Sequence, residues 1–301
     1  MKCQTHKYKI SIAIFLLFAF GITGFGQRDT LRLSTPDQAL NYLNNLPPLE
    51  RSSYWPNIDP DRLIEDLKTF TIEPLAFYEG SNTNFCSYAA LTYLPLEHDP
   101  LGFSKFMITL YQKGRASLGR KWLAPEKAVR EEAGLLKYKG ALDVSPAGQM
   151  FFLSLADQFK GYLNIFNRHF HKGDEDRLWA STNYAKFNRM LRRLFLVKTK
   201  TRGSDLIRPS IKDLSKYMQE ELKKGFVFLF LNNKKLYRKA HATGWISTPT
   251  HFVMLVDTKN TADGHIELVY WDYGKKTLQQ LSPQFLKSIV YGVTTAIVTE
   301  K

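Results

Sequence analysis

The sequence predicts an α+β fold in which helices fill the N-terminal portion and an antiparallel sheet closes the chain. Two observations predict this order. Through the first half of the chain, Ser, Thr or Asp repeatedly precedes Pro, and this pair suits the N-cap and the first turn of a helix. From residue 226 onward, apolar residues instead form short continuous runs of strand length.

Helix starts follow from these local pairs, which occur at 35–36, 59–60, 99–100 and 145–146. We expect helices over residues 37–46, 61–70, 100–113, 146–169, 183–195 and 210–224. A further helix is expected to begin at Cys86, with Asn84 as its N-cap. Pro95 should limit it to about three turns.

The C-terminal apolar runs predict about four or five strands, covered on at least one face by helices. The runs lie at residues 226–231, 252–256, 266–271 and 293–298. The intervening segment 232–250 contains turn-forming and basic residues with no clear period, which predicts a surface loop.

The N-terminus has the order of a secretory signal. A cationic stretch precedes an apolar run, Ile10 to Phe20, and small residues follow it. The run is shorter than the roughly 20 residues of a spanning helix, so we expect cleavage near Gly26 and no stable membrane span afterwards. The alternative is an uncleaved anchor. In both cases the body of the protein lies outside the cytoplasm, either in the periplasm or secreted.

Charge adds a constraint on partners. Removing the three lysines of the leader lowers the formal net charge from +14 to +11, so the mature chain stays basic. The basic residues are dispersed, and no run is dense enough to predict a nucleic-acid-binding arm. A basic surface favours an anionic surface partner, although most such charge is simply solvated.

Cys86 is the most informative residue. Once the leader is removed it is the one cysteine left, so we expect no internal disulfide. An unpaired thiol in an exported protein needs a reason. It is either a nucleophile or a buried structural residue. Its place at a helix start favours the nucleophile, because backbone N–H groups there favour a thiolate and bind an oxyanion.

The last strands supply partners for such a thiol. The connection between the runs at 252–256 and 266–271 contains Asn, Asp and Gly, which favours a hairpin. If Asp257 pairs with Ile266, the antiparallel register places His251 directly opposite Asp272. Side chains opposite one another lie about 4.5–5.5 Å apart at Cβ, so the carboxylate can orient the imidazole.

At this point the chain resembles the papain-like cysteine peptidases, over roughly residues 80–299. Three phrases look most like the bacterial branch that includes bacteriocin-leader peptidases, at residues 223–231, 250–257 and 269–274. In that branch a strand comes after a helix and a glycine. The sequence His-aromatic-Val follows this strand, and an Asp near a Gly comes later. The resemblance implies a papain-like fold with the nucleophile helix packed on the C-terminal antiparallel sheet.

By this resemblance Cys86 is the nucleophile, His251 the general base and acid, and Asp272 the residue that orients His251. The family's oxyanion donor is a glutamine shortly before the cysteine. Here the amides available are Asn82 and Asn84.

The other candidate site residues are supported by weaker patterns. Trp245 and Trp271 are near His251 and Asp272 in sequence and are candidates for a substrate cleft. His169 and His171 have residue types that suit a metal, but their spacing is more typical of solvated surface. We expect no metal and no cofactor.

The sequence therefore predicts a signal peptide over 1–26, a helical segment and candidate pro-segment over 27–75, and a papain-like hydrolase domain over 76–301. The predicted activity is amide hydrolysis on a peptide, a protein or peptidoglycan. Two alternatives stay open. One is a transglutaminase-like acyltransferase, and the other is a non-catalytic protein of the same fold that binds an anionic partner.

Overall fold

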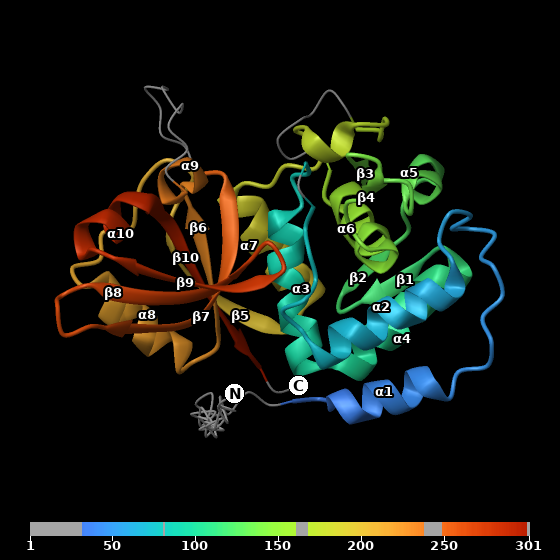
Figure 1. Cartoon of the computed structure of the whole chain (residues 1–301), viewed down its shortest axis with the longest axis horizontal. Helices are drawn as coiled ribbons and strands as arrows, with labels where there is room; N and C mark the ends of the chain where they lie inside the picture. Colours follow the sequence, from blue (N-terminus) through green and yellow to red (C-terminus); the bar gives the residue numbers. More distant parts are fainter. Residues whose placement is uncertain (1–31, 81, 161–167, 238–248, 300–301) are drawn as a thin grey trace, which may run out of the picture.

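The computed structural model describes residues 32–80, 82–160, 168–237 and 249–299. The predicted signal peptide and Trp245 lie outside these residues. Helices from the N-terminal part of the chain gather on one side of the molecule, and the C-terminal strands form a sheet on the other (Figure 1). The α+β prediction is confirmed at this level.

The helices begin where capping chemistry predicts. Thr35 forms a capping box, and Asp59, Asp99 and Ser145 each accept a hydrogen bond from a first-turn N–H. In chain order the helices are α1 (Pro36–Asn44), α2 (Pro60–Ile72), α3 (Cys86–His98), α4 (Pro100–Lys113), α5 (Lys127–Glu132), α6 (Pro146–Gln158), α7 (Tyr184–Leu194), α8 (Leu214–Leu222), α9 (Asn233–Leu236) and α10 (Pro283–Ile289).

Three helix predictions need correction. α3 runs through Pro95 to His98, because proline removes one hydrogen bond without ending a helix that is packed on every side. α6 ends at Gln158 rather than near 169. The predicted loop 232–250 opens with the short helix α9, which Asn232 caps.

The main sheet is antiparallel, with six strands in the order β5-β10-β6-β7-β8-β9. Its strands are β5 (Val197–Gly203), β6 (Phe226–Leu231), β7 (His251–Asn260), β8 (Ile266–Asp272), β9 (Lys275–Leu281) and β10 (Val290–Val298). Two small hairpins pair β1 (Ala116–Leu118) with β2 (Lys121–Leu123) and β3 (Lys137–Tyr138) with β4 (Ala141–Leu142). Sequence reasoning missed β5 and β9. Both are edge strands, which are half-exposed and therefore carry polar residues in place of an apolar run.

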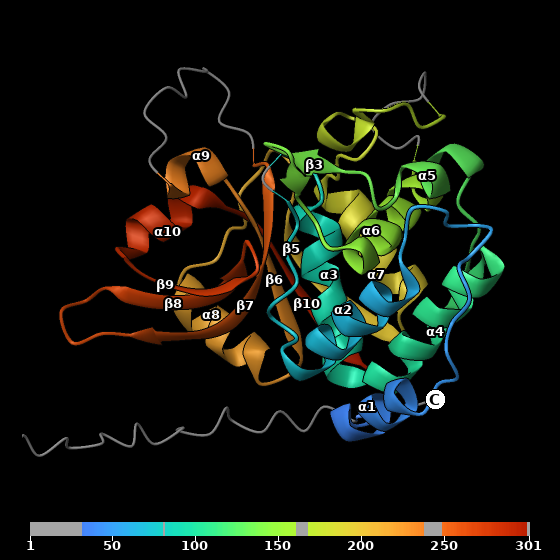
Figure 2. The ribbon, with the colours of Figure 1, turned by 45° about the vertical axis from the view of Figure 1, so that its right-hand side comes forward.

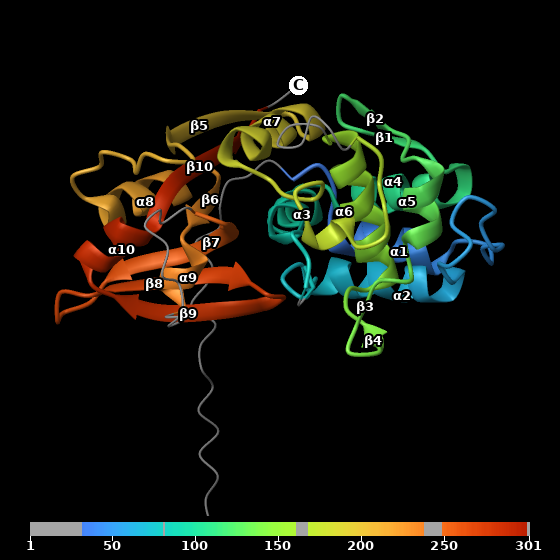
Figure 3. The ribbon, with the colours of Figure 1, turned by 90° about the horizontal axis from the view of Figure 1, so that it is seen from above.

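Helices cover both faces of the sheet, which explains the continuous apolar runs. In β6, Phe228 and Phe230 belong to the core shared with the N-terminal helices, whereas Val227 and Leu229 belong to the core under α8 and α10. α3 packs on β7 from the first side and α8 packs on it from the second. Figures 2 and 3 show α3 between the sheet and the remaining N-terminal helices.

The segment around α1 and α2 is part of the main core. Leu43, Trp55 and Leu67 are buried in the same cluster as the α3 and α6 side chains, and Trp55 Nε1 donates to the carbonyl oxygen of Leu110 (2.8 Å). That this segment is a pro-segment stays a prediction. Among the described helices, none has the length and apolar content to cross a membrane.

Candidate active site

Cys86 is the first residue of α3, and its thiol is free and partly accessible. Its Sγ lies 3.9 Å from the carbonyl oxygen of Thr250, the residue before β7. Position 85 is the N-cap, and no side chain caps this helix. Since the first N–H groups of a helix have no partner within it, those of α3 are open to a ligand at the sulfur.

Asn84 is therefore not the N-cap, and that prediction is wrong. Its amide donates instead to the carbonyl oxygen of Arg177 (3.0 Å), and its backbone N–H donates to that of Glu175 (2.8 Å). The loop before α3 is thus anchored to segment 174–177. Asn82 turns the same way, with Nδ2 3.5 Å from Asp176 Oδ2. Both amides therefore already have acceptors within the protein. Their roles as oxyanion donors stay predictions.

His251 and Asp272 are in direct contact. His251 Nε2 lies 2.5 Å from Asp272 Oδ1, and both side chains are buried. His251 opens β7 and Asp272 closes β8, as expected from the sequence. The hydrogen bond occupies Nε2, which leaves Nδ1 on the other side of the ring.

The register that produces this contact differs from the predicted one. Asn260, not Asp257, pairs with Ile266, and a bulge at Val256 then shifts the pairing by one residue. Continued past the Met254–Trp271 pair, this register sets Asp272 opposite Val253. His251 is two residues farther along the same side of β7, so it reaches Asp272 diagonally. The predicted contact still forms because the observed register differs there from the predicted one by two residues. An even shift keeps His251 and Asp272 on the same face of the sheet.

Tyr237 holds the other oxygen of the Asp272 carboxylate. Its hydroxyl donates to Asp272 Oδ2 and lies 3.3 Å from the hydroxyl of Tyr270. Burial, together with the charge of Asp272, raises the pKa of Tyr237, so it stays a donor. Sequence reasoning missed this residue because it follows α9 in a segment without a hydrophobic period.

Tyr273 covers the imidazole. It lies in the two-residue turn between β8 and β9, where its φ is 49° and that of Gly274 is 68°. Asn and Gly are the residues that such a turn normally selects, and a tyrosine there is strained. Its ring stacks on His251 at a centroid distance of 5.3 Å. The strained residue thus shields one face of the imidazole.

Burial and two neighbouring side chains determine the charge of His251. Burial by itself would lower its pKa, but the hydrogen bond to Asp272 and the nearby side chain of Cys86 raise the pKa of His251 well above its ordinary value. The Asp272 carboxylate from β8 thus favours the imidazolium form of His251.

Trp271 is a structural residue and does not line a cleft, contrary to the prediction. It is fully buried, it stacks on Phe77 (centroids 4.9 Å apart), and its Nε1 donates to the carbonyl oxygen of Leu75 (3.0 Å). These contacts hold segment 75–77 against β8. This packing places Glu79, which follows soon after the segment, beside His251 and Asp272.

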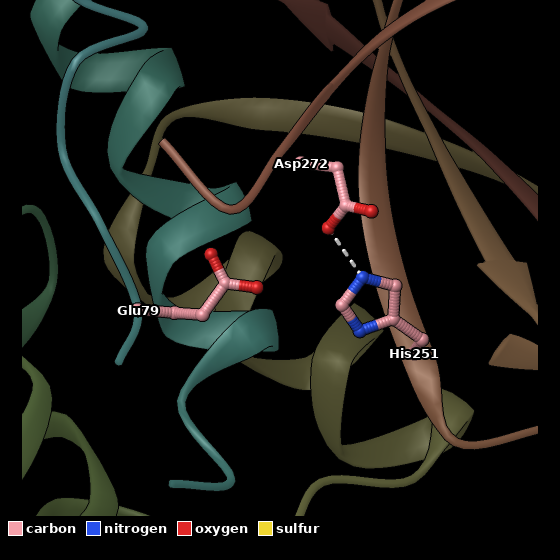
Figure 4. A group of neighbouring side chains, drawn as sticks. All are labelled: Glu79, His251 and Asp272. Atoms are coloured by element: carbon pink, nitrogen blue, oxygen red, sulfur yellow. Dashed lines mark hydrogen bonds and ion pairs between the residues drawn. The ribbon is translucent and has the colours of Figure 1, made fainter. Parts of the chain in front are cut away.

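Glu79 is the group that sequence reasoning missed. It is 1 % exposed, and neither carboxylate oxygen has a hydrogen-bond partner that meets the usual geometry. Figure 4 shows its carboxyl beside α3, directed toward His251 and Asp272. Burial, assisted by the charge of Asp272 and opposed by that of His251, raises the pKa of Glu79 to about 8.

The residue types of this cluster deserve a test against metal binding. Glu79, His251 and Asp272 each offer a ligand atom, and these atoms lie within 4.8 Å of one another. Asp272, however, already bonds His251 through one oxygen and Tyr237 through the other. A cation would have to break these contacts, so the arrangement fits a hydrogen-bonded relay better than a metal centre. His169 and His171 are exposed and lie outside the cluster.

Comparisons with protein-family models, with curated proteins and with solved structures found no match for this chain. Function is therefore inferred from side-chain contacts alone. The contact between His251 and Asp272 is the one with chemical meaning, because it gives an imidazole an orienting carboxylate. The free thiol of Cys86 lies 3.9 Å from the carbonyl oxygen of Thr250, the residue before His251.

Proposed function

We propose that this protein is an exported cysteine hydrolase that cleaves an amide bond through Cys86, His251 and Asp272 in a papain-like arrangement. The observation that carries the proposal is the buried hydrogen bond between His251 Nε2 and Asp272, next to a free thiol. The Sγ of Cys86, at the start of α3, lies 3.9 Å from the carbonyl oxygen of Thr250, the residue before His251. A thiol nucleophile needs both partners, one to take its proton and one to fix the tautomer of the base.

The chemistry follows from the positions of the groups. The Cys86 thiolate attacks the carbonyl carbon, and the open N–H groups of α3 donate to the oxyanion that forms. The His251 imidazolium then gives its proton to the leaving amine as the C–N bond breaks, which leaves a thioester on Cys86. Water, deprotonated by His251, attacks this thioester and releases the acid. Asp272 orients the ring throughout, and Tyr237 fixes Asp272.

A surface pocket that includes Asn84, two residues before Cys86, suits part of a substrate. It has a volume of about 500 Å³ and is lined by Asn84 together with residues of segment 174–181. Leu178 lines it and is 59 % exposed, which offers an apolar contact, while Asp176 and Arg177 offer charged ones. A peptide or the peptide part of peptidoglycan presents this mixture of apolar and polar groups.

Thiol reactivity tests the proposal. Iodoacetamide should alkylate Cys86 in the folded protein faster near neutral pH than it alkylates a free cysteine peptide, because in the proposed mechanism His251 takes the proton of the thiol as the sulfur attacks. His251→Ala should remove this advantage and leave the far-ultraviolet circular dichroism unchanged. Mass spectrometry of the modified peptide measures both rates.

Hydrolysis gives the second measurement. A casein digest and a peptidoglycan digest, each run with the unmodified protein and with Cys86→Ala, should show product only for the intact thiol. Alkylation no faster than that of the free peptide, with no product in either digest, would favour the non-catalytic binding protein. Product that forms only when an amine acceptor is added would indicate the acyltransferase.

A further inference from the structure

We propose that Glu79 is held as a neutral carboxylic acid and that its O–H supplies the second hydrogen bond to the oxyanion at Cys86. This inference rests on the proposed hydrolase function and adds the donor that Asn82 and Asn84 do not visibly provide. It also gives a role to a buried carboxyl whose oxygens otherwise have no partner.

The position of Glu79 supports this role. The packing of Phe77 on Trp271 and the hydrogen bond from Trp271 to Leu75 fix the segment that precedes it. The β8–β9 turn holds it from the other side, because a Cβ on Gly274 would come within 3.2 Å of the Phe77 carbonyl oxygen. Glu79 is thus wedged between the start of α3 and the strands that carry the imidazole (Figure 4).

The number of negative charges in the site favours the neutral form of Glu79. Asp272 is one anion, and a reacting Cys86 thiolate is a second, while His251 provides one cation. An ionised Glu79 would be a third anion in a buried space, within 4.8 Å of the first. Buried like charges of this kind are avoided by protonation of one member. A carboxyl kept neutral in an apolar site is also a good hydrogen-bond donor.

The groups that face Glu79 come from several elements. They are His251 of β7, Asp272 of β8, and Tyr273 of the turn, whose backbone N–H weakly favours the carboxylate. Of these, only His251 brings a positive charge, and Asp272 already neutralises it. Above about pH 8 the carboxyl ionises, which removes the donor and places a negative charge beside the oxyanion. The rate of the step that forms the oxyanion should therefore fall.

Two probes of Cys86 separate this role from a structural one. Acylation by p-nitrophenyl acetate passes through a tetrahedral oxyanion, whereas displacement of iodide from iodoacetamide does not. Glu79→Ala should slow acylation on the order of 100-fold, the usual effect of losing one oxyanion donor. It should leave the alkylation rate close to that of the unmodified protein. Rates with Cys86→Ala give the background.

Glu79→Gln is the decisive variant. Its amide has the same shape, keeps an N–H donor and does not ionise near pH 8. It should keep acylation near the unmodified rate and abolish the alkaline fall. Glu221→Gln is the matched control, because Glu221 is also 1 % exposed but its carboxylate bonds Lys200 and Thr295 beside α8. It should behave as the unmodified protein does.

The outcomes are distinguishable. If Cys86→Ala abolishes acylation but Glu79→Ala does not slow it, or if Glu79→Gln loses as much as Glu79→Ala, Glu79 is not the donor and the hydrolase proposal stands. If acylation persists in Cys86→Ala, the hydrolase proposal itself fails. Loss of acylation on chelation, with recovery on added Zn²⁺, would also overturn the inference by assigning the carboxyl to a metal.

Discussion

Glu79 and Glu221 are buried to the same extent, each 1 % exposed, but their surroundings differ completely. Glu221, at the end of α8, accepts hydrogen bonds from Lys200 (2.6 Å), Lys224 (2.9 Å) and Thr295 (2.8 Å). Burial would raise the pKa of Glu221, but these donors lower it to about 2. Glu79 has no such donors, and burial raises its pKa to about 8.

The difference separates a carboxylate that joins elements of the fold from a carboxyl that the proposed mechanism uses. Glu221 is ionised at neutral pH, fully bonded, and joins α8 to β5 and β10. Glu79 costs stability at neutral pH, because it must take up a proton on folding and leaves polar atoms unpaired. Such a cost, placed within reach of His251 and Cys86, is typical of a reactive site.

The largest expected effect is on turnover, at the residue that orients His251. Asp272→Ala should lower hydrolysis on the order of 100-fold, because the imidazole loses the partner that fixes its tautomer. Asp272→Asn should lose less, since the amide oxygen can still accept from Nε2–H. The rate of acylation by p-nitrophenyl acetate measures both. An Asp272→Ala protein as active as the unmodified one would remove Asp272 from the site.

The next effect is on the pH dependence of stability. Glu79 has a folded pKa of about 8, above its ordinary value of 4.5, so its contribution to stability is fully present below pH 4.5 and is lost as pH rises through 8. In this window the unmodified protein should lose about 1.4 kcal/mol per pH unit relative to Glu79→Gln. Comparing the two proteins cancels the shared contribution of His251.

Urea unfolding at steps across that window measures the difference in the free energy of unfolding. Equal slopes for the unmodified protein and Glu79→Gln would mean that Glu79 is ionised in the folded protein, and the contrast with Glu221 would disappear.

The effect of Glu221→Gln on the free energy of unfolding should be smaller, and its pH dependence should appear at acid rather than alkaline pH. The folded pKa of Glu221, about 2, lies below its ordinary value of 4.5, so the contribution of Glu221 to stability is present above pH 4.5 and is lost as pH falls through 2. At neutral pH the variant should be destabilised by about 1–2 kcal/mol, since both lysines remain half-exposed and water screens their charges. Urea unfolding measures it, and the acylation rate should not change.

The smallest effect is expected at the hydroxyl that fixes Asp272. Tyr237→Phe removes one donor to the carboxylate and leaves the hydrogen bond of His251 in place, so acylation should fall only a few-fold, corresponding to about 1 kcal/mol. Steady-state kinetics should show the loss in kcat rather than in KM. A loss as large as that of Asp272→Ala would mean that Tyr237, rather than His251, is the partner that matters.

Part of this molecule could be read from its sequence because the causes are local. Thr35, Asp59, Asp99 and Ser145 cap helices with their own side chains, whatever the rest of the chain does. The apolar run of β6 predicts a strand buried on both faces. The same local reasoning put Cys86 at a helix start and His251 and Asp272 at strand ends.

The tertiary structure decided what local patterns do not encode. The bulge at Val256 sets the register of β7 against β8, and a register depends on contacts between strands rather than on either strand alone. Asn84 fails as an N-cap because a distant segment takes its amide. The protonation of Glu79 depends on which donors the fold brings near it, and of these the backbone N–H of Tyr273 favours the carboxylate only weakly. A glutamate seven residues before Cys86 looks ordinary in the sequence, and only its burial beside His251 and Asp272 makes it an acid that can donate.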